Sequence, residues 1–196
     1  MNTFNLAHLM KRSQECLASL PADSRFRSIL EDFHPLLSGD VAYDFRDEEP
    51  FYSDGPFGRL TAEDQVSLAV WICRRYLTET GFTKCEEEAL ECLNHWLALR
   101  SEDIVFDLMF HSDVVDYEAL DGKFSDQIQC RMFLVSDSCE LARCIQEQGT
   151  EKGGGGWIES CFFDIYHHYR ERLGETQPWN TLFLAWLIER VELDKS

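Results

Sequence analysis

Residues 61–81 read TAEDQVSLAVWICRRYLTETG, and this stretch is the clearest indication of the class of fold. Thr61 supplies a hydroxyl that can cap a helix, and acidic residues follow in what would be the first turn. Apolar side chains then fall on most sides of a helix that runs to about Thr80, where Gly81 can end it. A helix that is apolar on most sides is typical of the centre of a helical protein.

Helical patterns also precede and follow this central segment. Apolar residues recur at helical spacing over 5–20, and again over 24–37 after a possible cap at Asp23 or Ser24. The tetrapeptide Thr-Lys-Cys-Glu at 83–86 has the pattern of a capping box and predicts a helix to about Leu99. Further helices are expected over 104–110, 136–148, 157–173 and 179–193.

These segments predict a mainly α protein, a single-domain bundle of about 7–8 helices over residues 1–196. Periodicity does not separate helix from strand in short apolar runs, so a minor β element around 127–135 is kept as an alternative. Two connecting segments interrupt the helical pattern. They are a long loop at 38–59, rich in acids and aromatics, and a glycine-rich connector at 153–156.

Composition indicates the environment of the protein. The chain is 44% hydrophobic and 13% aromatic, which is enough to build a core. Its N-terminus lacks the pattern of a signal peptide, and the longest apolar run, Leu182–Ile188, is far shorter than the ~20 residues of a membrane span. We expect a soluble cytoplasmic protein without membrane contact, whose eight cysteines are reduced and pack as small hydrophobic residues.

Negative charge is concentrated in the middle of the chain. The formal net charge is −18, and residues 85–121 hold eleven acids with Arg100 as their only cation. Such crowding fits a solvated face that keeps the protein soluble, or a field that steers a cationic partner. Direct nucleic-acid binding is not expected, because phosphate recognition needs clustered lysine and arginine and the 18 such residues are scattered.

We therefore expect a non-enzymatic interaction protein that needs no cofactor and that binds and inhibits a basic protein. The partner would be a nuclease toxin or a nucleic-acid-binding protein, as it is for immunity proteins and for inhibitors that imitate phosphate charge. Carboxylates would pair with cations of the partner, and aromatic side chains would be the buried anchors. The predicted partner-binding residues are Asp44, Asp47, Glu48, Glu49, Phe51, Tyr52, Phe57, Glu86, Glu87, Glu91, Glu102, Asp103 and Asp107.

Two other functions stay open at the level of sequence. One is a small helical metal-dependent enzyme that uses His34, Asp164 and His167, since an acid three residues before a histidine projects from the same side of a helix. His168 lies beside this group without an assigned role. The other is a structural subunit of a larger assembly, in which exposed aromatic residues contact neighbouring subunits. Self-association is left open.

A zinc site within the helix after Thr83 is not expected. Cys85, Cys92 and His95 fall within one helical segment, and zinc needs ligands that converge on one point. At 1.5 Å per residue the two thiols are separated by ~10 Å along the helix axis, which is too far to share one ion. We expect both cysteines to be core residues.

Overall fold

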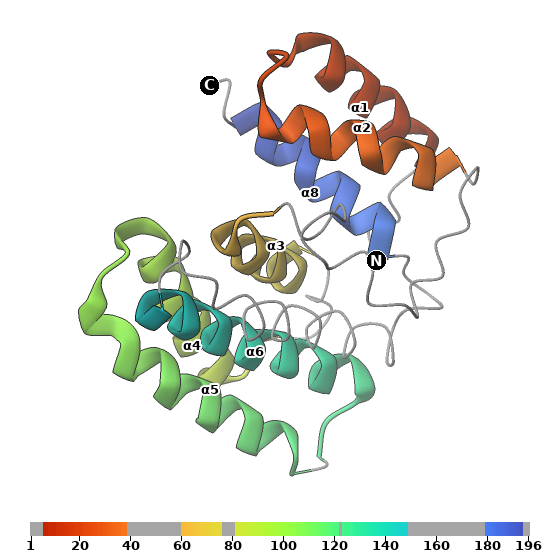
Figure 1. Cartoon of the computed structure of the whole chain (residues 1–196). Helices are drawn as coiled ribbons and strands as arrows, with labels where there is room; N and C mark the ends of the chain where they lie inside the picture. Colours follow the sequence, from red (N-terminus) through yellow and green to blue (C-terminus); the bar gives the residue numbers. More distant parts are fainter. Residues whose placement is uncertain (1–5, 39–59, 76–80, 122, 149–178, 194–196) are drawn as a thin grey trace. The chain divides into compact units, whose positions relative to one another are not determined.

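The structure is a computed structural model of the whole chain, and it describes residues 6–38, 60–75, 81–121, 123–148 and 179–193 (Figure 1). Within these ranges the chain is predominantly helical and holds no strand, which confirms the mainly α fold. The loop at 38–59 beyond its first residue, the connector at 153–156 and the helix expected over 157–173 lie outside the described residues.

Contacts along the chain divide it into two compact units, residues 1–59 with 176–196 and residues 60–175. Each unit is described by itself, and a single domain over 1–196 stays a prediction. The first unit contains α1 (Leu6–Ser19), α2 (Arg25–Ser38) and α8 (Trp179–Leu193). The second contains α3 (Ala62–Arg75), α4 (Lys84–Leu99), the 3-10 helix η2 (Glu102–Ile104), α5 (Val105–Ala119) and α6 (Asp126–Gln148).

The first unit brings the last described helix against the first two, as Figure 1 shows. Arg27 of α2 donates hydrogen bonds from Nη1 to the carbonyls of Leu17 and Leu20, at 3.1 and 2.7 Å, and so ties α2 to the end of α1. Arg12 of α1 pairs with Glu192 of α8 across 2.6 Å. The bounds predicted for the final helix, 179–193, are confirmed.

The second unit is built around α6, which contacts α3, α4 and α5 (Figure 1). The helix that the sequence places in the centre, α3, is buried along most of its length, with Val66, Leu68 and Ile72 fully enclosed. It begins with a reciprocal cap. Thr61 Oγ1 accepts from the Asp64 amide at 3.2 Å, while Asp64 Oδ2 accepts from the Thr61 amide at 3.2 Å.

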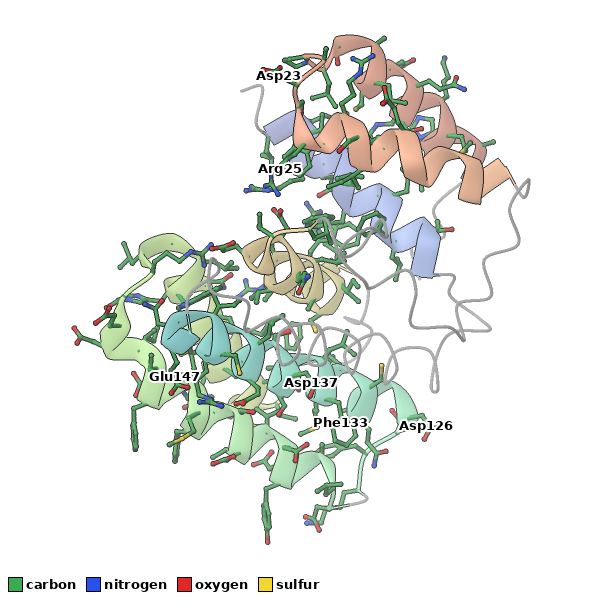
Figure 2. All side chains as sticks on the ribbon, in the orientation of Figure 1. Asp23, Arg25, Asp126, Phe133, Asp137 and Glu147 are labelled. Atoms are coloured by element: carbon green, nitrogen blue, oxygen red, sulfur yellow. The ribbon has the colours of Figure 1, made fainter. Side chains whose placement is uncertain are left out.

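The helix α6 is longer than the sequence predicts, and Asp126 and Glu147 lie near its two ends (Figure 2). Residues 127–135 are helical, so the alternative of a β element there is wrong. Residues 130–136 are all buried, because α6 is packed against three helices, and this part of the helix therefore has no exposed polar face that would reveal a helical period.

The predicted start of a helix at residues 136–138 is also wrong, because α6 continues through this segment. Ser138 donates from Oγ to the Leu134 carbonyl one turn earlier in the same helix. Ser136 Oγ bonds instead to Ser112 of α5, with an oxygen–oxygen distance of 3.0 Å. One hydroxyl thus bonds within its own helix and the other bonds between helices, at a position where the sequence suggested the start of a helix.

A buried ion pair joins the start of α4 to α6. Arg131 Nε and Nη2 donate to the two carboxylate oxygens of Glu86 at 2.6 and 2.9 Å, and the two side chains are 1% and 0% exposed. Glu86 also accepts from the Thr83 amide at 2.7 Å, which completes the predicted capping box of α4. Arg131 further donates to the Gly81 carbonyl at 3.1 Å and lies over the ring of Phe82.

Removing one partner of this pair is expected to destabilise the protein strongly. Glu86→Ala leaves the Arg131 charge buried without its carboxylate, and such a change costs about 3–5 kcal/mol of unfolding free energy. Urea unfolding followed by circular dichroism measures the loss. The control is Glu87→Ala at the adjacent exposed position, which should stay within about 0.5 kcal/mol of the parent protein.

Replacing both partners distinguishes the stability lost through an unpaired buried charge from the stability lost with the other contacts. Glu86→Met with Arg131→Met leaves no charge unpaired, so the double variant is expected to lose less stability than Glu86→Ala alone. A Glu86→Ala protein as stable as the Glu87→Ala control would contradict the role given to this pair.

Candidate acidic protein-binding site

A tight turn after α4 creates the candidate site. Arg100 adopts a left-handed conformation with φ of 52°, and its amide donates to the Trp96 carbonyl at 2.9 Å, which ends α4. The chain then enters η2 and α5, and α5 packs beside α4. Between α4 and the η2–α5 segment lies an open groove of about 510 Å³, which we call the acidic groove.

Carboxylates from three helices line the acidic groove. Glu88 and Glu91 come from α4, Asp103 from η2 and Asp107 from α5. Among the described residues, none that lines the groove is lysine or arginine. The full lining consists of Glu88, Glu91, Cys92, His95, Ser101, Asp103, Ile104, Asp107 and His111. Residues far apart in sequence therefore place their negative charge around one hollow.

The only cation of the acidic segment 85–121 is engaged elsewhere. The guanidinium of Arg100 lies 4.0 Å from the centre of the Trp96 ring and 3.9 Å from Glu63 of α3, and Arg100 does not line the groove. Burial lowers the pKa of Arg100, although Glu63 opposes this change. Lys84 is 3.4 Å from Glu88, but this pair is exposed and so contributes little.

Three of the predicted partner-binding residues, Glu91, Asp103 and Asp107, line the acidic groove. Glu87 and Glu102 are exposed on the same helices but lie outside its lining. The remaining candidates, apart from Glu86, fall in the loop that the structure does not describe; they are Asp44, Asp47, Glu48, Glu49, Phe51, Tyr52 and Phe57.

The prediction that Glu86 faces a partner is wrong. This carboxylate is fully buried, because it occupies the capping-box position of α4 and bonds to both the Thr83 amide and Arg131. A glutamate three residues after a threonine cap turns back toward the start of its helix. Its charge is matched inside the protein and adds nothing to the field of the surface.

Sequence reasoning missed Glu88 and the two histidines of the groove, His95 and His111. Glu88, Glu91 and His95 are spaced by three and four residues, so they share one face of α4, and His111 follows Asp107 by four residues on α5. The spacing could have shown that these residues share one face of each helix. It could not have shown that the two faces line one groove, because the sequence does not show that α4 pairs with α5.

The residues proposed for a metal-dependent enzyme are not brought together by the described part of the chain. His34 belongs to α2, but its side chain is not described, and Asp164, His167 and His168 fall outside the described ranges. Among the described residues, no group of three or more histidine, cysteine or acidic side chains is arranged to hold a metal ion.

The two cysteines of α4, Cys85 and Cys92, have weakly acidic thiols. The seven described cysteines are buried and form no disulfide. Burial, and then the charge of Asp107, raises the pKa of Cys92 to about 11. Burial also raises the pKa of Cys85 to about 11, and its Sγ donates to Glu118 Oε2 at 3.1 Å. These thiols are therefore poor nucleophiles at neutral pH.

Alkylation by iodoacetamide at pH 8 tests the state of these thiols. A pKa of about 11 leaves about 100-fold less thiolate than an ordinary cysteine carries, so Cys92 should react far more slowly in the folded chain than in urea. Asp107→Asn removes a charge that raises the pKa of Cys92, and should speed labelling there but not at Cys85. Peptide mass spectrometry over time measures both sites, and labelling of Cys92 at the unfolded-chain rate would contradict this assignment.

Comparison with protein-family models, curated proteins and solved structures finds no match to this chain. None of the described helices combines the length and apolar character needed to cross a membrane. The function of the protein is therefore inferred from the chemistry of the acidic groove.

Proposed function

We propose that this protein binds a basic protein through the acidic groove and inhibits it. The observation that supports this proposal is the convergence of Glu91, Asp103 and Asp107, which are 12 and 16 residues apart in sequence, on one hollow. Like charges gathered around one hollow repel one another. A cationic partner relieves that repulsion when it binds.

The charge of the acidic groove favours a partner that binds phosphate groups. Nucleases and other nucleic-acid-binding proteins present clustered lysine and arginine to phosphate groups. Carboxylates fixed on α4, η2 and α5 offer those cations a ready array of negative charge. A protein bound in this way occupies the place of the nucleic acid, which is the action of an immunity protein or of a nucleic-acid mimic.

Electrostatic attraction also predicts how the complex forms. Opposite fields accelerate association by ~10–1000-fold at low ionic strength, and added salt screens them over a Debye length of ~10 Å at 0.1 M. Binding should therefore be fast at low salt and should weaken steeply as the salt concentration rises.

Charge reversal in the acidic groove tests the proposal. The chain is immobilised, basic proteins are captured from its host at low salt and eluted with a salt gradient, and the dissociation constant of each is then measured with purified components. Glu91→Lys with Asp103→Lys is expected to weaken binding at least tenfold, because each new cation repels the partner. The difference in affinity between this variant and the parent chain should be largest at low salt.

The matched control reverses two exposed acids of the first unit, Glu15→Lys with Asp23→Lys, and changes the net charge by the same amount. It should retain most of the affinity. Equal loss in both variants would assign binding to net charge alone, and unchanged binding by the groove variant would contradict the proposal. The groove variant should keep its thermal transition, since it removes repulsion between exposed carboxylates.

A further inference from the structure

The outer side of α5 carries an uncovered apolar stripe. Phe106, Met109, Phe110, Tyr117 and Leu120 are 67%, 41%, 53%, 80% and 69% exposed. Their spacing keeps all five within one face of α5 and of the turn that follows it, over ~21 Å at 1.5 Å per residue. Figure 2 shows side chains projecting from α5 on the side away from α6. We call these five residues the α5 stripe.

The opposite face of α5 already forms part of the core. Leu108, Val115 and Ala119 are buried, and α5 packs against α4 and α6. The helix thus has two apolar faces, of which only one is covered within the described part of the chain. Exposed apolar patches of this kind mark surfaces that bind other molecules.

One acidic residue interrupts the α5 stripe. Asp113 lies between Phe110 and Tyr117 on the same face, and the three line an open groove of about 780 Å³. Glu118 and Asp121 also line it, and Lys123, the only cation among the described residues of its wall, is paired with Asp121. The hollow therefore combines aromatic surface with a surplus of negative charge.

We propose that the α5 stripe receives an amphipathic helix of the basic partner. This helix carries apolar anchors every three or four residues and one lysine or arginine in the middle of its apolar face, opposite Asp113. The inference rests on the proposed function and names the element by which the partner is recognised. Aliphatic stems of lysine and arginine also cover apolar surface while their charged ends reach the neighbouring carboxylates.

Charge complementarity distinguishes this occupant from two others. A second copy of the chain would bring Asp113, Glu118 and Asp121 against the same acids of its partner, and each chain carries a net charge of −18. An anionic membrane surface would be repelled in the same way. A cationic helix with an apolar face matches both the aromatic side chains and the acids around them.

The α5 stripe and the acidic groove share one helix, which lets a single partner engage both. Asp107 lines the acidic groove and directly follows Phe106 of the stripe. A helix docked on the stripe therefore has its cationic side close to the groove. The apolar anchors would supply slow dissociation, and the carboxylates fast association.

A designed peptide tests the inference with the full chain. The probe is a synthetic, dye-labelled helix with leucines on one face, lysines elsewhere and one lysine in the centre of the leucine face. Its comparison is a scrambled peptide of the same composition without an apolar face. Fluorescence anisotropy should show the designed probe bound at least tenfold more tightly than the scrambled one.

Variants then locate the binding surface. Phe110→Ser with Tyr117→Ser should weaken binding of the designed probe at least tenfold and leave the scrambled peptide unchanged. The matched control, Leu99→Ser with Leu193→Ser, removes two equally exposed leucines outside the stripe and should leave both peptides unchanged. Asp113→Asn should abolish the preference for a central lysine over a central leucine. Thermal unfolding verifies that each variant is folded.

The outcomes separate this inference from the proposed function. Equal binding of both peptides, unaffected by the stripe variants but weakened by Glu91→Lys with Asp103→Lys, would overturn the docking helix while supporting the acidic groove. Absence of salt-dependent binding of either peptide would overturn both. A chain that sediments as a dimer, and becomes a monomer with Phe110→Ser and Tyr117→Ser, would show that a second copy occupies the stripe and would overturn the inference.

Discussion

The buried contact between Arg131 and Glu86 determines how α4 sits on α6, and the placement of the acidic surface follows from it. A charge removed from water is tolerated only where hydrogen bonds satisfy it, and here the carboxylate meets two guanidinium nitrogens and a backbone amide. Because Glu86 lies in the first turn of α4, the contact sets which face of that helix is buried. Glu87, Glu88 and Glu91 are left on its exposed side.

The parts of the fold that local chemistry specifies could be predicted from the sequence. Capping at Thr61 and Thr83 and the apolar run of the final helix depend on near neighbours, and the starts of these helices were predicted correctly. The start of α6 could not be predicted, because burial on all sides over residues 130–136 removes the periodicity by which a helix is recognised. Ser136 and Ser138 suggested the start of a helix only because their hydrogen-bond partners in the folded chain were unknown.

The residues of the candidate site were likewise predicted only in part. The sequence showed that negative charge is concentrated in 85–121, and Asp103 and Asp107 do face the acidic groove. It did not show that Glu86 is matched by Arg131, a residue 45 positions away, or that Glu88 and His95 join the lining. The α5 stripe could not be predicted from the sequence for a related reason. Both faces of α5 are apolar, and which one is covered depends on where α4 and α6 lie.

The enclosed thiols have a consequence for how the chain must be handled. Seven cysteines from both units are buried in the folded chain, and no disulfide joins any two of them. In the unfolded chain these thiols are exposed. An oxidant present while the chain folds would therefore form disulfides between cysteines that the native core keeps apart. Sulfur that gains oxygen becomes polar and no longer suits an apolar interior. Reducing agent is therefore needed while the chain folds, and matters far less for these seven thiols afterwards.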